Sequence, residues 1–179
     1  MVGRCPVGLA VYFEPTIGPQ TRELESRLIL QKNFLDDQLV FAFNATVAQE
    51  WRYLHGDPSA PLGSEEAADH WDKETDVNFG LATSYRFASN WSAGLELINE
   101  REWAGLDPFH ANMRTNVAYY WGPTLHYAGE HLFATLTVLD QLPWAKDYAN
   151  PPPGFVVGGR NYADDFERFR VRLKFGYFF

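Results

Sequence analysis

Four basic side chains recur at every second position near the C-terminus: Arg168, Arg170, Arg172 and Lys174. Successive side chains of a β-strand point to opposite faces, so this spacing places all four on one side of a strand. A row of cations could attract anions and line an anion-selective pore. The alternative, which we favour, is a structural network with glutamates, because charges removed from water need partners.

Other arrangements that could do chemistry are weaker. Residues 55–76 carry several carboxylates, which hard divalent cations prefer as ligands, but their spacing matches no ordered metal loop. A hydrolase would need a nucleophilic serine close to a histidine. His110 has no neighbouring serine, and His126 and His131 flank an expected turn. We therefore expect no enzymatic activity, no metal site and no cofactor.

The elements that position these charges are predicted by a period of two in the apolar side chains. In the last segment, Phe169, Val171, Leu173, Phe175 and Tyr177 alternate with the basic row. Similar alternation recurs upstream and predicts eight strands in all. The expected ranges are 7–17, 23–32, 39–52, 76–87, 91–98, 116–127, 131–138 and 168–179.

The same pattern bears on whether the chain could cross a membrane. No segment approaches the roughly 18 consecutive apolar residues of a membrane helix, so a crossing would use strands. In hydrocarbon every backbone polar group must be bonded internally, which for a sheet requires a closed barrel. A basic side chain facing lipid near the midplane would cost roughly 2–4 kcal/mol, so the basic row must point inward. We predict an all-β, antiparallel, up-and-down transmembrane β-barrel, one domain over residues 1–179.

Such a barrel would enclose charges of both signs. The side chains expected to line the lumen are Glu14, Glu25, Arg27, Glu50, Arg52, Arg86, Glu96, Arg168, Arg170, Arg172 and Lys174, with Glu23 and Glu100 beside them. In a closed eight-stranded barrel, side chains would fill the interior as an ion-paired plug. A barrel with more strands could hold a wet lumen. The N-terminus carries no export signal, so the sequence is either a mature form or a fragment, and we expect the eight strands to be the C-terminal part of a larger barrel.

Connection lengths and aromatic side chains fit this topology. Short turns are expected near residues 35–37, 88–90 and 128–130, and longer loops over 54–74, 104–114 and 143–165, with a short one at 18–20. Short turns on one side and long loops on the other are typical of outer-membrane barrels. Aromatic residues such as Trp103 would anchor the strands at the lipid interface. Pro123 falls inside a strand, where we expect a bulge.

The net charge and the cysteine content bear on the partners and on the possible disulfides. The formal net charge is −8, and the single cysteine, Cys5, permits no intramolecular disulfide. The acidic balance argues against a nucleic-acid partner, which would require a basic patch. The oligomeric state cannot be read from this sequence.

The last strand resembles a known signal. The stretch from Phe169 to Phe179 resembles the C-terminal β-signal of bacterial outer-membrane β-barrel proteins, in which alternating apolar residues end on phenylalanine. The resemblance implies that Phe175, Tyr177 and Phe179 act in recognition by the barrel-assembly machinery. It also implies location in the bacterial outer membrane, in contact with its lipid and lipopolysaccharide. Residues 8–15 further resemble a strand of uncharacterised outer-membrane proteins, which implies no activity.

Three functional interpretations remain at this point. The first is an outer-membrane channel or transporter for small solutes. The second is a structural or surface-interaction barrel whose lumen is plugged by ion pairs. The third is a soluble lipocalin-like binding barrel with apolar residues inside, which would leave the aromatic residues at both strand ends and the terminal Phe179 unexplained.

Overall fold

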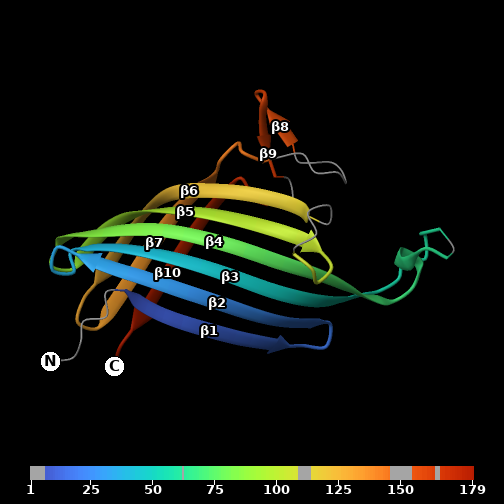
Figure 1. Ribbon diagram of the computed structural model, residues 1–179, viewed down its shortest axis with the longest axis horizontal. Coiled ribbons are helices and arrows are strands. Elements are labelled where there is room, and N and C mark those ends of the chain that lie inside the picture. The colour runs from blue at the N-terminus through green and yellow to red at the C-terminus, as the bar shows by residue number, and fades with distance from the viewer. Residues whose placement is uncertain (1–6, 62, 109–113, 146–154, 164–165) are drawn as a thin grey trace.

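A computed structural model describes residues 7–61, 63–108, 114–145, 155–163 and 166–179. Eight strands form one antiparallel sheet in which neighbours in sequence are neighbours in space, which confirms the predicted all-β, up-and-down fold (Figure 1). The strands are β1 (Gly8–Ile17), β2 (Thr21–Phe34), β3 (Leu39–Leu54), β4 (His70–Ala88), β5 (Trp91–Ala104), β6 (Arg114–Ala128), β7 (Leu132–Gln141) and β10 (Phe169–Tyr177). No described helix is long and apolar enough to cross a membrane.

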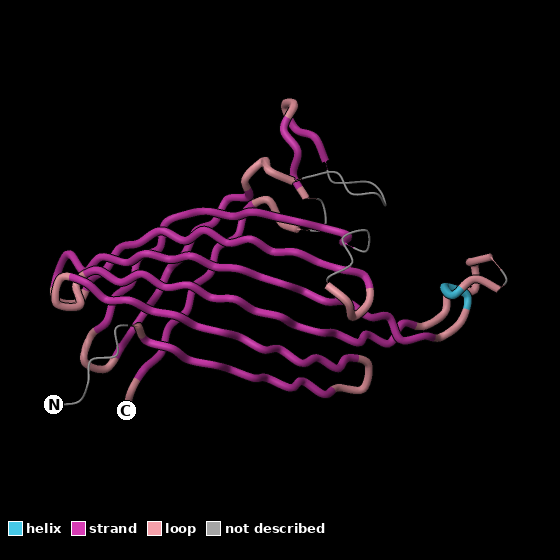
Figure 2. The backbone as a smooth tube through the Cα atoms, viewed as in Figure 1, coloured by secondary structure: helices cyan, strands magenta, loops and turns pink. Residues whose placement is uncertain are grey.

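The sheet curls into a half-barrel, with β7 and β10 lying behind the plane of the other strands in Figure 2. Side chains of β10 reach β5 across the two strands between them, which requires curvature toward that face. Within the described chain, β1 pairs only with β2, and β10 pairs only with β7. As far as the described residues go, the curled sheet is therefore open, with one free edge on each side.

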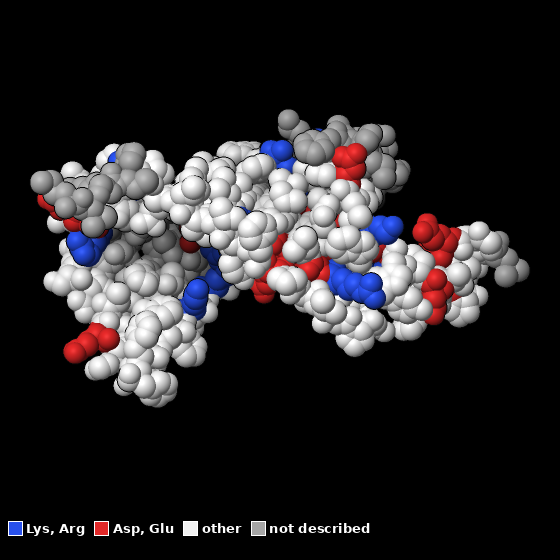
Figure 3. Space-filling model, turned by 60° about the horizontal axis from the view of Figure 1, so that its bottom comes forward, with Lys and Arg blue, Asp and Glu red and all other residues white. Residues whose placement is uncertain are grey.

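The two faces of the sheet differ in polarity. On the convex face, Leu173 and Phe175 are 66% and 73% exposed, and Leu81 in the central strand β4 is 55% exposed. On the enclosed, concave face, Tyr120 and Thr137 are almost fully buried. Figure 3 shows charged side chains gathered along the hollow, with broad uncharged surfaces beside it. A buried cluster that includes Tyr120 and Leu139 also lies on the concave side. The convex face nevertheless exposes large apolar side chains of a kind that soluble proteins usually keep inside.

The connections confirm the predicted difference between the two ends of the sheet. Short turns join β2 to β3, β4 to β5 and β6 to β7 at one end, where β1 begins and the C-terminus lies (Figure 1). Longer connections join β3 to β4, β5 to β6 and β7 to β10 at the other end, which we call the outer end. Cys5, His110 and the proline-rich run of residues 151–154, which falls within the predicted loop of 143–165, lie outside the described residues.

Several predicted boundaries were wrong. Strands β3, β4 and β5 run further toward the outer end than expected, so the loop between β3 and β4 covers only residues 55–69 and contains a 3-10 turn, η1 (Glu65–Ala67). The connection expected as an irregular loop over 143–165 contains a hairpin of β8 (Phe155–Val157) and β9 (Arg160–Tyr162). These strands have three residues each, too few for a period of two to be recognised.

Two local expectations were also wrong. The pairing of β6 with β7 keeps one register on both sides of Pro123 and only omits pairs there, so the proline interrupts hydrogen bonding without a bulge. Trp103 is only 6% exposed and cannot be an interface anchor. It pairs with the buried Thr75, whose hydroxyl donates to the carbonyl of Gly105, so the chain turns back over this region.

Candidate functional site

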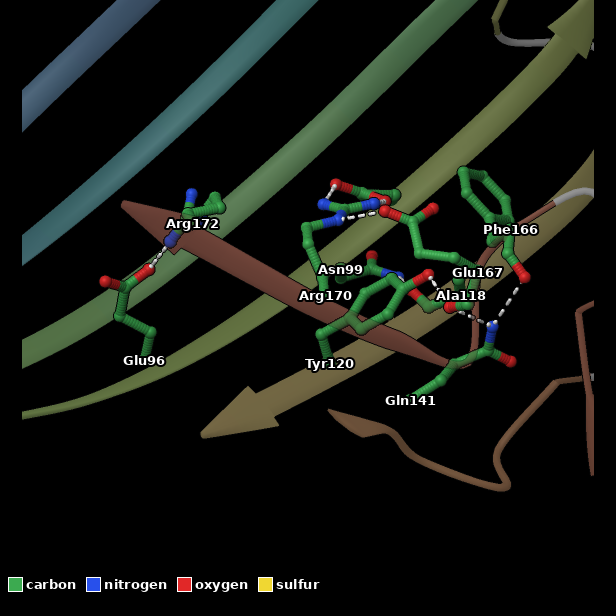
Figure 4. A network of polar contacts seen from close by, with 10 residues as sticks. Glu96, Asn99, Ala118, Tyr120, Gln141, Phe166, Glu167, Arg170 and Arg172 are labelled. Atoms are coloured by element: carbon green, nitrogen blue, oxygen red, sulfur yellow. Dashed lines mark hydrogen bonds and ion pairs between the residues drawn. The ribbon is translucent and has the colours of Figure 1, made fainter. Parts of the chain in front are cut away.

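The best-defined polar site lies on the concave face, where β10 meets β5 (Figure 4). Arg170 binds Glu100 in a bidentate manner, with Nη1 and Nη2 at 2.7 and 3.0 Å from the two carboxylate oxygens. Both side chains are about four-fifths buried, at 20% and 17% exposure. The same guanidinium group also bonds Glu167 and lies 4.6 Å from the ring centre of Tyr120. Bidentate, partly buried pairs of this kind are the strong form of ion pair.

A second pair continues this network along β10. Arg172 bonds the carboxylate of Glu96 (Figure 4). This carboxylate also accepts a hydrogen bond of 3.1 Å from the hydroxyl of Thr137. The predicted basic row and the predicted glutamates therefore do meet across the sheet. Lys174, the next basic residue on the same face, forms no ion pair with a described residue.

The segment that precedes β10 is held by hydrogen bonds from uncharged polar side chains that the sequence analysis did not single out. The hydroxyl of Tyr120 donates to the carbonyl of Glu167 at 2.6 Å. The side chain of Gln141 accepts from the backbone N–H of Ala163 at 2.7 Å and donates to the carbonyl of Ala163 at 3.2 Å. The same amide nitrogen also donates to the backbone carbonyls of Phe166 and Glu167 at 3.4 and 3.3 Å (Figure 4).

In the strand predicted over residues 116–127, alternation places Tyr120 on the same face as the polar Asn116 and Thr124. Gln141 lay beyond the expected end of its strand.

On the β1–β4 side of the hollow, the predicted lining residues pair within strands or between neighbours. Arg27 bonds Glu25 at 2.7 Å. Arg52 bonds Glu50 at 2.9 Å and lies 3.6 Å from Glu74. These arginine side chains are 40% and 50% exposed, so the pairs are screened by solvent and contribute less than the Arg170 site.

The remaining predicted lining residues lie apart from these pairs. Glu14 accepts a hydrogen bond from Tyr12 on its own strand and forms no ion pair with a described residue. Arg86 is exposed near the short turn that joins β4 to β5. Arg168 precedes β10 instead of belonging to it, and its guanidinium group lies 3.7 Å from the ring centre of Tyr162.

Carboxylates gather at the outer end of the concave face. Ligand atoms of Glu74, Asp76 and Glu102 lie within 4.8 Å of one another, an arrangement that a hard cation could use. Glu23 faces Glu50 in the register of β2 and β3 and adds to this negative region. The negative potential here contrasts with the basic residues of β10.

The loop of residues 55–69 is held by Asp69. Its carboxylate accepts hydrogen bonds of 2.9 Å from the backbone N–H of Gly56 and 2.8 Å from the hydroxyl of Tyr53. These bonds stabilise the ionised form, so they lower the pKa of Asp69 below its usual value.

Just before β10, the hydrogen bond from Arg170 likewise lowers the pKa of Glu167.

The residues that resemble an assembly signal lie on the convex face at the end of β10. Phe175 and Tyr177 are 73% and 58% exposed, and Phe179 is fully exposed. The rings of Tyr177 and Phe179 meet edge to face with their centres 5.3 Å apart. These side chains are available to a recognition partner or to lipid.

Comparisons with known proteins identify one relationship. Neither the curated proteins nor the solved structures contain a significant match to this chain. One family model, described as a family of unknown function (DUF6662), matches residues 6–179, which include every element of the sheet and the whole polar site. The chain belongs to this family of unknown function, DUF6662.

Proposed function

We propose that this chain is an integral protein of the bacterial outer membrane, in which the curled sheet forms a β-barrel wall with an ion-paired lumen. Its convex face would contact outer-membrane lipid. Its outer-end loops and the β8–β9 hairpin would contact lipopolysaccharide and other surface partners. Phe175, Tyr177 and Phe179 would be read by the barrel-assembly machinery.

The observation that carries this proposal is the reversed polarity of the sheet. Large apolar side chains are exposed on every strand of the convex face, for example Leu9 at 65%, Leu81 at 55% and Val171 at 56%. Water would make this surface costly, at about 25 cal/mol per Å² of exposed apolar area, whereas hydrocarbon would not. Apart from residues near the strand ends, such as Asp140 on the convex face, the charged residues of the strands face the hollow, where they can bond one another or contact water.

The ion pairs favour a plugged lumen over an open one. Arg170 and Arg172 of β10 both reach glutamates of β5, so their side chains occupy the space enclosed on that side. Paired charges offer less attraction to a passing ion than free ones. Function in this proposal therefore rests on the outer-end surface and on the structural role of the wall.

The membrane proposal is tested with protein refolded from urea into lipid vesicles. The folded protein should float with the vesicles, resist extraction by carbonate and migrate differently on a gel before and after heating. The central strands should resist added protease while the loop of residues 55–69 is cleaved. Protein that remains soluble without lipid or detergent and does not float would contradict the proposal.

A second candidate function is a narrow channel for small solutes. The observation in its favour is the separation of charge along the hollow, with carboxylates such as Asp76 near the outer end and Lys174 near the short-turn end. Planar-bilayer recordings decide between the two functions. Steady single-channel conductance would support the channel, and its absence in protein shown to be inserted would support the plugged barrel.

A further inference from the structure

The two free edges of the sheet are the feature with no assigned partner. One edge of β1 and one edge of β10 carry backbone groups that no strand pairs within the described chain. Unpaired backbone groups are costly in hydrocarbon, and a free edge is a template for another strand. The two strands have similar lengths, ten residues in β1 and nine in β10.

The registers define how the two edges are offset. A continuous line of paired residues crosses all eight strands, with every member on the convex face. It runs through Phe169, Asp140, Trp121, Leu97, Leu81, Phe43, Leu30 and Leu9. The line therefore begins at the outer end of β10 and finishes near the opposite end of β1.

Two antiparallel registers of β1 with β10 use all nine residues of β10, and one of these keeps the apolar residues of both strands on the same face. It pairs Leu9 with Tyr177, Phe13 with Leu173 and Ile17 with Phe169. Shifts by two residues, which keep the apolar face outward, leave residues of β10 unpaired. In this register the line from Phe169 would return to β1 at Ile17, eight residues beyond Leu9. A stagger of about eight residues around eight strands is a combination in which barrels close.

The ion pairs independently indicate the direction of strand tilt. Arg172 pairs through Thr137 and Thr124 with Gly94, so Gly94 is its partner along the hydrogen-bonding direction. Its side chain instead bonds Glu96, two residues closer to the outer end of β5. On going from β10 toward β1, the residue that lies level with a starting residue is thus closer to the outer end than the residue reached by following the strand pairing. The proposed stagger has the same sign.

From these observations we infer that β10 of the same chain is the partner of the free β1 edge, and that the sheet closes by pairing Leu9–Ile17 with Phe169–Tyr177. Closure places Glu14 opposite Arg172 and Tyr12 opposite Lys174 on the enclosed face. Glu14 and Lys174 are the members of this seam that have no ion pair among the described residues. The inference rests on the proposed membrane location for its driving force, because only hydrocarbon makes a free edge so costly.

The test uses double-cysteine variants in a Cys5→Ser background, refolded into vesicles and treated with a short bismaleimide. Phe13→Cys with Leu173→Cys should cross-link within one chain, because directly opposed side chains lie about 5 Å apart. A second in-register pair, Leu9→Cys with Tyr177→Cys, guards against a local folding defect. Mass spectrometry of the digested monomer band identifies the joined peptides.

Two control pairs set the limits of the assay. Phe13→Cys with Ser26→Cys joins residues that are already paired in β1 and β2 and must cross-link. Phe13→Cys with Phe169→Cys is four residues out of register, about 13 Å apart along the strand, and should yield roughly tenfold less product.

The outcomes separate the two proposals. Monomeric cross-link in both in-register pairs, exceeding that of the shifted control, supports closure. Covalent dimers would mean that the edges pair between copies, and absence of product alongside a positive Phe13–Ser26 control would mean that the edge has another partner; either result overturns closure. Flotation of the same samples reports membrane location by itself, so vesicle-bound protein that fails to cross-link loses only the closure.

Discussion

Replacing Leu81 by arginine is the sharpest perturbation of the convex face. Leu81 lies in the middle of β4, is 55% exposed, and is flanked across the sheet by Phe43 and Leu97. If this face contacts lipid, the new guanidinium group is placed in hydrocarbon. The expected loss of stability is about 2–4 kcal/mol, as for arginine at the midplane of other barrels.

The matched control is Gln31→Arg on the concave face. Gln31 belongs to the neighbouring line of pairs through Ala42 and Ala82, and its side chain is already polar and exposed. An arginine there remains in a polar environment, so the free energy of unfolding should change by roughly 0.5 kcal/mol or less.

The assay is equilibrium unfolding by urea of protein reconstituted in vesicles, followed by tryptophan fluorescence. Because each 1.4 kcal/mol is about a factor of ten in the folding equilibrium, Leu81→Arg should reduce the folding equilibrium constant by roughly 30-fold to 700-fold. Equal effects of the two variants, or a larger effect of Gln31→Arg, would refute the assignment of the convex face to lipid.

Three further predictions concern the network, the packing and the loop. Glu100→Gln removes the charge that faces Arg170 and should cost about 1.5–3 kcal/mol in the same unfolding assay. Gly122→Ala should prevent folding or cost roughly 3 kcal/mol, because a Cβ would lie 1.8 Å from a backbone oxygen of β7, whereas Gly80→Ala meets its nearest neighbour at 3.8 Å and should be tolerated. The hydrogen bonds of Asp69 should stabilise the loop of residues 55–69 fully at pH values above the ordinary carboxyl pKa of about 3.9. This stabilisation should be lost as the pH falls through the lower pKa that Asp69 has in the folded state, so proteolysis of the loop should accelerate at acid pH.

Each of these has its own control. Glu25→Gln, which breaks the exposed pair of Glu25 with Arg27, should lower the free energy of unfolding by less than about 1 kcal/mol. A loss equal to that of Glu100→Gln would contradict the larger contribution assigned to the ion pair between β5 and β10. Asp69→Asn should open the loop at neutral pH and abolish its acid dependence. Unchanged proteolysis in that variant would assign the loop's order to other contacts.

The strands and their order were predictable because a period of two is strong wherever one face is apolar. The segment around Leu173 shows this without exception, and the structure places a strand there. The ends of strands were less predictable, since side chains such as Lys73 and Arg101 interrupt the alternation near the outer end. The buried position of Trp103 depends on the chain turning back at Gly105, which no local pattern reports.

The polar site was predictable in part. Alternation assigned Arg170 and Glu100 to one face, but not to each other, because the partner across a curled sheet depends on strand tilt and curvature. The anchoring role of Gln141 depends on the path of the chain before β10. Alternation in the sequence predicts which face each side chain lies on, whereas the ion-pair partners are known only once the sheet is assembled.

The central claim, that the convex face meets hydrocarbon and the concave face does not, is tested most directly by spin-label accessibility along β4. Single cysteines at each position from Phe79 to Arg86, in a Cys5→Ser background, are labelled and reconstituted in vesicles. Accessibility to oxygen should alternate with a period of two and peak at Leu81 and its odd-numbered neighbours, while a water-soluble nickel complex should reach the even-numbered positions. Oxygen maxima at the even positions, or no alternation at all, would contradict the account.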